Sequence, residues 1–411
     1  MGNLSDILRL RVIRRPKTIS TIHDVTQSVG RCIDYLHNSV PDPERYVLRA
    51  IGMFLLRREV ATSQHHAIQS MLRNIDIPPL EREAQSHGYP DSFSAVMECW
   101  LSHYKKSDRN WHGAFYTPDP LAGFLVRSTD TLLQEMGYTG FSDTRLTTID
   151  PACGTGHLLC SALECGLKHE PAYGTFYGMD ILSAAADVCD LRMHSLAGKY
   201  GAHCGSCIRC ETGDALTAFP DTPVSPPVAV LCAAPFNQYA TCALQPESSA
   251  AVLHSSYAAA CDFSGLDAYA HTDAYIKFTA LCHDLVVRSS SGVAALILRN
   301  NWLSSHAHAE MRKAILQDFD GVYILDLHGD PHDRFHTESG RNDENVYAGM
   351  VYDVGVCVCF LVRGAGKGTT IIQKADLTGS RSMKWDWLLQ HSLGSVAWRM
   401  VTPKNPWCAF V

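Results

Sequence analysis

The spacing of apolar residues changes along the chain and separates an N-terminal helical part from a longer part of mixed pattern. Over residues 1–110 the apolar positions recur three and four residues apart, which is typical of helices that bury one face. Helices are expected at residues 22–38, 43–75 and 91–106, with breaks at Pro41, Pro78-Pro79 and Gly88. Residues 1–110 are therefore expected to form a helical N-terminal domain.

From residue 146 onward, short apolar runs alternate with helical patterns, which predicts a doubly wound α/β sheet. Helices are expected at residues 276–288 and 307–317. The final apolar run follows its neighbour after a long loop without a helix, so we expect it to form an antiparallel strand at the sheet edge. Strands are expected at residues 146–150, 175–180, 208–212, 228–232, 293–299, 321–327 and 354–362.

These patterns place a second domain at residues 111–363, with seven mostly parallel strands. Clear periodicity is lost after residue 363, so residues 364–411 are expected to be a C-terminal extension. The longest apolar runs, such as residues 293–298, are too short to cross a bilayer, and the N-terminus has no signal-peptide apolar core. We expect a cytoplasmic protein with no membrane partner.

The net charge and the cysteine content exclude few functional classes. A formal net charge of -7 does not indicate a general nucleic-acid binder, although a local basic face would suffice for phosphate contacts. The 16 cysteines are scattered through apolar segments and are expected to be small buried hydrophobes in a reducing compartment. Cys204, Cys207 and Cys210 have metal-knuckle spacing beside His203, but no second C-x-x-C pair completes a zinc site. Free thiols without a metal are therefore the prediction, and a zinc site closed by Cys204, Cys207 and His203 remains an alternative.

The most informative stretch is residues 149–157, I-D-P-A-C-G-T-G-H. An apolar run enters an acid-proline pair, and glycines then precede a helical pattern, which predicts strand, tight turn and helix. Glycine lets the backbone approach a ligand closely, and the following helix N-terminus can hold an anionic group. A second predicted strand ends at Asp180 and a third is followed by Asp214, where ligand contacts are expected at the carboxyl ends of parallel strands.

The D-P-A-C-G-T-G motif followed by Asp180 resembles the S-adenosylmethionine-dependent methyltransferases. The upstream G-A-F-Y-T-P at residues 113–118 resembles the segment that precedes this motif in adenine methyltransferases. Further downstream, D-L-H-G at residues 326–329, D-E-N-V at 343–346, G-V-C-V at 355–358 and the terminal N-P-W-x-x-F-V resemble the methyltransferase region of type ISP restriction-modification enzymes. The resemblance covers roughly residues 113–411.

This resemblance implies a class I methyltransferase fold, Rossmann-like with a mostly parallel sheet, and S-adenosylmethionine as the cofactor. It implies double-stranded DNA as the partner, with an adenine flipped out of the helix and a separate specificity, helicase or nuclease component. The residues that would bind the cofactor are Phe115, Tyr116, Thr117, Asp150, Pro151, Ala152, Cys153, Gly154, Gly156, Asp180, Ile181, Asp214 and Ala215.

The acceptor motif of these enzymes, N-P-P-[FY], corresponds here to Ala233, Ala234, Pro235 and Phe236. In the family, the Asn side chain and a prolyl carbonyl accept hydrogen bonds from the target amine, and the aromatic ring stacks on the base. Ala233 has no side-chain acceptor, and the loss of such a contact costs on the order of 3 kcal/mol in the transition state. The prediction is a DNA adenine methyltransferase that Ala233 impairs. A pseudo-methyltransferase that binds DNA or cofactor, and an amino-methyltransferase of another substrate, remain alternatives.

Overall fold

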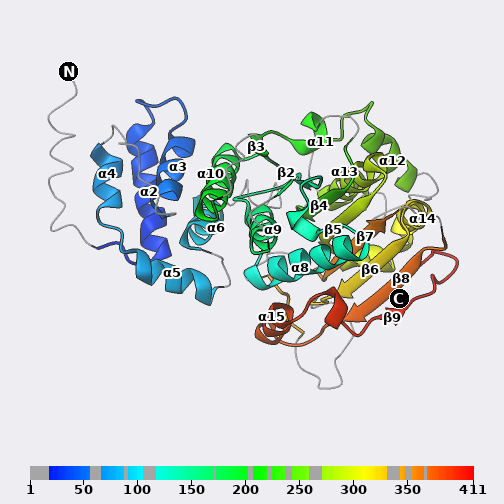
Figure 1. Cartoon of the computed structure of the whole chain (residues 1–411). Helices are drawn as coiled ribbons and strands as arrows, with labels where there is room; N and C mark the ends of the chain where they lie inside the picture. Colours follow the sequence, from blue (N-terminus) through cyan, green and yellow to red (C-terminus); the bar gives the residue numbers. More distant parts are fainter. Residues whose placement is uncertain are drawn as a thin grey trace. The chain divides into compact units, whose positions relative to one another are not determined.

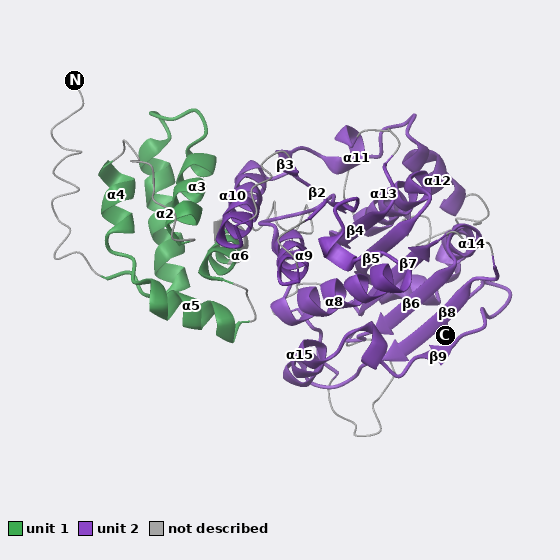
Figure 2. Ribbon diagram, viewed as in Figure 1, with its two compact units in different colours: residues 1–105 green, residues 106–411 purple. Residues whose placement is uncertain are grey.

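The computed structural model describes residues 18–55, 66–87, 91–104, 117–169, 173–201, 207–219, 224–236, 243–258, 271–330, 343–347, 354–364 and 368–411. The chain divides into two compact units, residues 1–105 and 106–411 (Figure 2).

Unit 1 is helical in its described residues, as its apolar spacing predicts. Thr21 caps the first helix, because its side-chain oxygen accepts a hydrogen bond from the Asp24 amide at 3.1 Å. The buried side chains of that helix, Val25, Val29 and Leu36 among them, make the core that the other helices cover. The helices are α2 (Ile22–Leu36), α3 (Pro43–Leu55), α4 (His66–Leu72), α5 (Ile77–Ser86) and α6 (Ser92–Tyr104). Residues 56–65, within the helix expected at 43–75, lie outside the described residues.

Unit 2 is built on one sheet of nine strands in the order β3-β2-β1-β4-β5-β7-β6-β8-β9 (Figure 1). The strands are β1 (Thr147–Asp150), β2 (Thr175–Asp180), β3 (Ile208–Thr212), β4 (Val228–Ala233), β5 (Gly292–Arg299), β6 (Gly321–Asp326), β7 (Val356–Arg363), β8 (Ile371–Asp376) and β9 (Arg399–Met400). All seven predicted strands are present, and the α/β class is confirmed. The parallel neighbours β3, β2, β1, β4 and β5 form one half of the sheet.

Two details of the predicted sheet are wrong. The antiparallel strand β7 is not at the edge, since it pairs with β5 on one side and β6 on the other. Residues 364–411 also belong to the sheet: β8 runs parallel to β6, and β9 pairs antiparallel with β8. These strands escaped prediction because β8 alternates imperfectly between buried and exposed residues and β9 has two residues.

Two groups of helices cover the sheet (Figure 1). One group consists of four helices that pack against one another: α8 (Asp119–Glu135), α9 (His157–Leu167), α10 (Ser183–Lys199) and α15 (Arg381–Gln390). The other contains α11 (Ala215–Ala218), α12 (Ser249–Ala258), α13 (Ala274–Ser289) and α14 (Ala309–Asp318). Strand β5 is buried at every position from Gly292 to Leu298, as expected for a strand covered on both faces. Short 3-10 helices lie at η1 (Gly140–Ser142), η3 (Asn300–Leu303), η4 (His306–His308) and η5 (Leu393–Ser395).

The C-terminal segment is connected by hydrogen bonds to the turns that follow β5. The buried Arg312 guanidinium donates to the carbonyl oxygens of Trp407 at 2.6 Å and Cys408 at 3.0 Å, and also to that of Ser305 at 2.8 Å. The Phe410 amide donates to the Leu303 carbonyl at 2.9 Å. This segment therefore supports η3 and η4. Within the described residues, no helix has the length and apolar character needed to cross a membrane.

Candidate functional site

The carboxyl ends of β1, β2 and β3 bring the three predicted acids to one edge of the sheet. Asp150 ends β1 and pairs in register with Gly178, and Asp180 ends β2 opposite Thr212. Asp214 follows β3 and caps α11. Ligands of open α/β sheets bind at this edge, so the three acids lie where a ligand site is expected.

The glycine turn between β1 and α9 requires glycine at its end. Gly154 and Gly156 have φ angles of +52° and +84°, in the left-handed region. A Cβ on Gly156 would lie 2.6 Å from Cys189 Sγ and 3.1 Å from the Cys189 Cα. The turn is also held to β2, because the Cys153 amide donates to the Met179 carbonyl at 2.9 Å. The absence of side chains at these two positions therefore shapes the loop.

We expect Gly156→Ala to destabilise the protein. The left-handed backbone alone costs about 1–2 kcal/mol for a residue with a Cβ, and the contact with Cys189 adds to it. Gly198→Ala in α10 is the matched control, since a Cβ there meets nothing within 4 Å. Urea denaturation should show a lower free energy of unfolding for the first variant only. Equal stability of the two variants would contradict the role of the turn.

Asp180 organises the same turn through both carboxylate oxygens. Oδ2 accepts a hydrogen bond from the Gly154 amide at 2.8 Å, and Oδ1 accepts one from the Leu182 amide at 2.8 Å. The next residue, Ile181, is an apolar side chain that is 48% exposed. Asp214 uses one oxygen to accept from the Leu216 amide at 3.0 Å, and Ala215 is buried beside it.

Asp150 lies beneath the turn rather than on its surface. Its residue is 1% exposed, and Oδ1 accepts a hydrogen bond from the Ala152 amide at 3.0 Å. Burial raises the pKa of this carboxyl to about 8, with a further contribution from the Asp180 charge. Pro151, Cys153 and Gly156 are buried as well, whereas Ala152 and Gly154 are partly exposed. A ligand would meet the loop mainly through those two residues.

Several cysteines cluster near the turn. Cys189 Sγ of α10 lies 3.2 Å from Cys210 Sγ of β3. Cys207 is disulfide-bonded, which differs from the predicted set of reduced thiols. His203 and Cys204, which the sequence left open as zinc ligands, lie outside the described residues.

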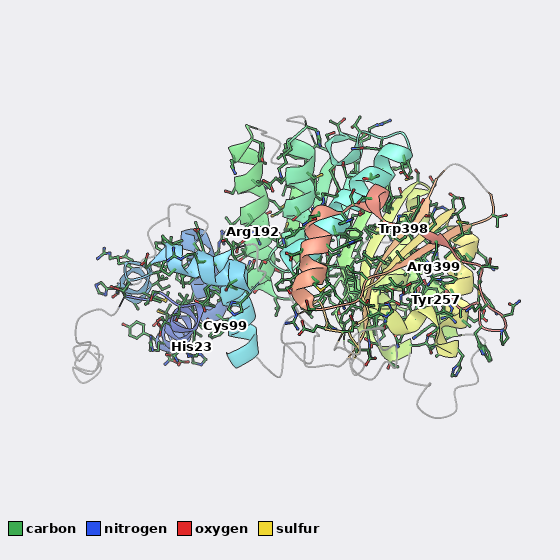
Figure 3. The ribbon with its side chains drawn as sticks, turned by 90° about the horizontal axis from the view of Figure 1, so that it is seen from below. His23, Cys99, Arg192, Tyr257, Trp398 and Arg399 are labelled. Carbon is green, nitrogen blue, oxygen red and sulfur yellow. The ribbon has the colours of Figure 1, made fainter. Side chains whose placement is uncertain are left out.

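The segment upstream of the sheet reaches the same loop at Thr117. Its carbonyl oxygen is 2.9 Å from His157 Nδ1, and its side chain hydrogen-bonds Tyr347. Arg192 of α10, labelled in Figure 3, donates to the Thr155 carbonyl at 2.8 Å. The predicted partners Phe115 and Tyr116 lie outside the described residues. Prediction from sequence gave no role to His157 or Arg192, although His157 stands in the motif itself.

The predicted acceptor motif continues directly from β4. Ala233 is partly exposed, Ala234 and Phe236 are buried, and Pro235 lies between them at intermediate exposure. The Phe236 ring meets the Tyr275 ring edge to face, with centroids 6.3 Å apart. The described residues end here at Phe236 and resume at residue 243.

A polar group stands beside this aromatic pair. The Tyr275 hydroxyl donates to Asn301 Oδ1 at 2.8 Å and lies 3.2 Å from His308 Nε2. Burial lowers the pKa of His308 to about 3, so the ring is neutral near pH 7. No pattern in the sequence marked His308 as a partner of Tyr275. The arrangement provides uncharged hydrogen-bonding groups beside an aromatic surface.

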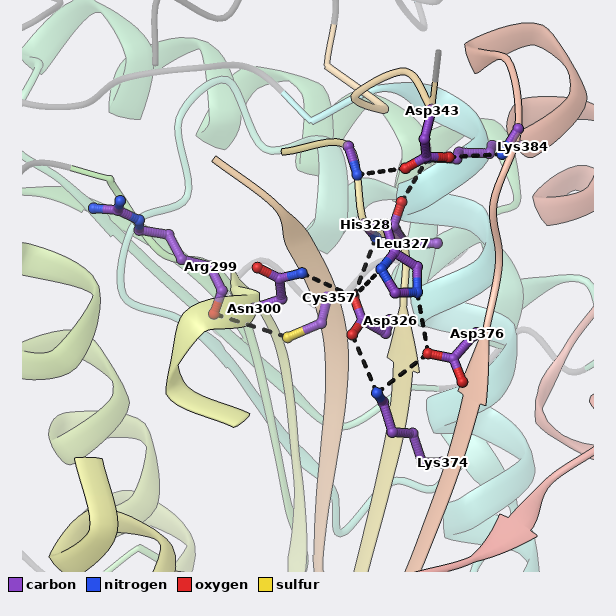
Figure 4. Close-up of polar contacts among 12 residues, drawn as sticks. Arg299, Asn300, Asp326, Leu327, His328, Asp343, Cys357, Lys374, Asp376 and Lys384 are labelled. Carbon is purple, nitrogen blue, oxygen red and sulfur yellow. Dashed lines mark hydrogen bonds and ion pairs between the residues drawn. The ribbon is translucent and has the colours of Figure 1, made fainter. Parts of the chain in front are cut away.

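A charged network lies farther along the edge, at the ends of β6 and β8 (Figure 4). Asp326, His328 and Asp376 are the described side chains grouped closely enough to hold a metal ion. Lys374 Nζ, however, lies 3.3 Å from Asp326 Oδ2 and 3.2 Å from Asp376 Oδ1, and Arg399 also contacts Asp376. Burial opposes protonation of His328, but its hydrogen bond to Asp376 and the Asp326 charge raise its pKa overall. Because protein cations already neutralise these carboxylates, we assign no metal to the group.

Comparisons with solved structures identify the fold. The DrdV–DNA complex aligns with a TM-score of 0.66 at 17% identity, over 93% of this chain and 45% of that one. The type ISP enzyme LlaBIII bound to DNA gives 0.66 at 15% identity, over 95% and 32%. A Listeria monocytogenes protein described as a class I S-adenosylmethionine-dependent methyltransferase gives 0.51 at 14%, over 90% and 97%. The fold is that of the class I methyltransferases.

Comparison of the sequence with known proteins identifies the family. The type II methyltransferase M.VspI from Vibrio sp. (strain 343) is 31% identical over 134 residues, which are 33% of this chain and 27% of that protein. The chain thus matches about a quarter of the length of this curated relative. Residues 89–324, more than half of the chain, match the family model for N-6 DNA methylases. The chain therefore belongs to the N-6 DNA methylase family.

Proposed function

We propose that the protein binds S-adenosylmethionine at the turn between β1 and α9 and methylates the exocyclic amine of an adenine flipped out of duplex DNA. The observation that carries the proposal is that Asp150, Asp180 and Asp214 lie at one edge of the sheet with the glycine turn, which Asp180 contacts, and that β4, which leads into Pro235-Phe236, pairs with β1. Family membership and the fold support the same reaction class.

The residues around the turn fit this cofactor in chemical type. The turn presents Ala152 and Gly154, which are partly exposed, and the Asp180 carboxylate at the end of β2 is followed by the exposed apolar side chain of Ile181. The bound cofactor would supply the activated methyl group. The protein would contribute positioning, since methyl transfer from a sulfonium needs the donor and the acceptor amine held in line.

The acceptor side supports a planar base as the substrate. Phe236 and Tyr275 form an aromatic corner, and Asn301, which accepts from Tyr275, is exposed beside it. Carboxamides pair with the edge of adenine, which offers both a donor and an acceptor. DNA as the substrate is consistent with DrdV and LlaBIII, whose structures are DNA complexes. Target selection, unwinding or cleavage would come from other segments or subunits.

Ala233 favours a second candidate function. Without a side-chain acceptor at the end of β4, the amine loses one of the groups that would stabilise its developing positive charge. The protein would then act as a pseudo-methyltransferase that binds DNA or S-adenosylmethionine with little turnover. An amino-methyltransferase of a non-DNA substrate would use the same aromatic corner.

Cofactor binding provides the direct test. In calorimetric titration, S-adenosylmethionine should bind the unsubstituted protein, and Asp180→Ala should weaken binding about 10- to 100-fold, because it removes charge-assisted bonds to the Gly154 and Leu182 amides. Glu247→Ala, which removes an exposed acid of the same unit, should change nothing. Absence of binding by the unsubstituted protein would refute the proposal.

Transfer of labelled methyl groups separates the substrates. Adenine-containing duplex DNA should accept label, and prior methylation of its adenines at N6 should abolish the acceptance. Label in protein or small amines, but not in DNA, would favour the non-DNA alternative. Cofactor binding without transfer to any acceptor would favour the pseudo-methyltransferase.

A further inference from the structure

His157 joins two segments that are far apart in the sequence. It is the first residue of α9, directly after Gly156, and it is 8% exposed. Its Nδ1 lies 2.9 Å from the carbonyl oxygen of Thr117, and its Nε2 lies 3.0 Å from Oδ1 of Asp119. The side chain therefore links the glycine turn to the start of α8.

The two hydrogen-bond partners of His157 determine which of its ring nitrogens donate. A backbone carbonyl can only accept, so Nδ1 must carry a proton and donate to Thr117. The hydrogen bond from His157 is the main cause that holds the pKa of Asp119 below its ordinary value, which keeps this carboxylate ionised. Nε2 therefore also faces an acceptor, and both nitrogens donate only when the ring is a protonated imidazolium that pairs with Asp119. The ring is fixed at both nitrogens, and its orientation is determined.

Thr117 is held from a second direction. Its side chain hydrogen-bonds the buried Tyr347, whose own amide donates to Asn345 Oδ1 at 2.9 Å. The opposite flank of the glycine turn is held by Arg192, through the Thr155 carbonyl. The turn and Thr117 are thus fixed relative to each other by His157, while the remaining contacts anchor each of them to the rest of unit 2.

We propose that His157 is a positioning residue for the cofactor site: through its Nδ1 bond it holds Thr117 against the turn at Gly154–Gly156, so that both contribute to one binding surface. The inference rests on the proposed function. A histidine that only stabilised the helix start would have its effect on unfolding, whereas a positioning residue has its effect on ligand affinity.

Two substitutions separate the two ring nitrogens. His157→Asn places an amide nitrogen near the position of Nδ1 and keeps the bond to Thr117, whereas His157→Gln reaches toward Asp119 and loses that bond. In calorimetric titration of the full chain with S-adenosylmethionine, the Asn variant should bind within about threefold of the unsubstituted protein, and the Gln variant at least tenfold more weakly. Their urea midpoints should be alike.

The outcomes are distinct. Equal affinities in both variants, or an affinity loss that follows a matching loss of stability, would overturn the positioning role. If the unsubstituted protein does not bind, the proposed function fails and the inference fails with it. A second measurement does not depend on a folded Gln variant: in the unsubstituted protein, S-adenosylmethionine should slow amide hydrogen exchange at residues 117–122, and unchanged exchange there would also overturn the inference.

Discussion

Replacing Ala233 with asparagine should raise the rate of methyl transfer to DNA about a hundredfold or more, since one transition-state hydrogen bond of this kind is worth on the order of 3 kcal/mol. The backbone at this position is the end of β4, in register with Ile297 of β5, so the new side chain would extend from an ordered strand. Ala233 itself is partly exposed, which leaves space for a larger side chain at this position. Transfer of labelled methyl groups under single-turnover conditions would measure the gain.

The control for this substitution is Ala233→Val, which adds comparable bulk without an acceptor and should leave the rate low. Both variants should bind S-adenosylmethionine as the unsubstituted protein does. If Ala233→Asn binds the cofactor but transfers no more label than Ala233→Val, the missing carboxamide is not the limiting feature, and the pseudo-methyltransferase becomes the better description.

The buried carboxyl of Asp150 should make stability depend on pH. Its pKa is about 8 in the folded protein against an ordinary value of 3.8, so the folded state binds the proton more tightly than the unfolded state does. The free energy of unfolding should therefore fall as pH rises from about 4 to about 8, by at most about 6 kcal/mol in total from this group. Below pH 4 the carboxyl is protonated in both states and the stabilisation is fully present.

Asp150→Asn removes this titration and keeps an oxygen that can accept from the Ala152 amide. Urea denaturation of both proteins at several pH values would isolate the group, because all other titrations cancel in the difference. The variant should lose less stability between pH 4 and pH 8. Parallel pH profiles would show that the carboxyl is better solvated than its burial indicates.

Local patterns in the sequence were sufficient for seven strands of unit 2, β1 to β7, and for the sheet edge at which Asp150 and Asp180 lie. β2 and β3 begin and end at the predicted residues, and both are short segments that lead into turns: Asp180 ends β2, and Gly213-Asp214 follows β3. The order strand, glycine turn and helix at residues 147–167 was likewise predictable, because glycine is the residue that most readily adopts the positive φ angles found at Gly154 and Gly156.

Contacts between distant segments were decided only by the tertiary structure. No local pattern could show that β7 inserts between β5 and β6, or that residues 371–400 continue the sheet, because strand pairing depends on partners far along the chain. The same holds for the bond from His157 to Thr117, 40 residues apart, and for the burial that raises the pKa of Asp150. The sequence by itself determined the fold class and the motif residues of this N-6 DNA methylase family member; packing decided which motif residues are exposed at the turn and which are buried and hold the others in place.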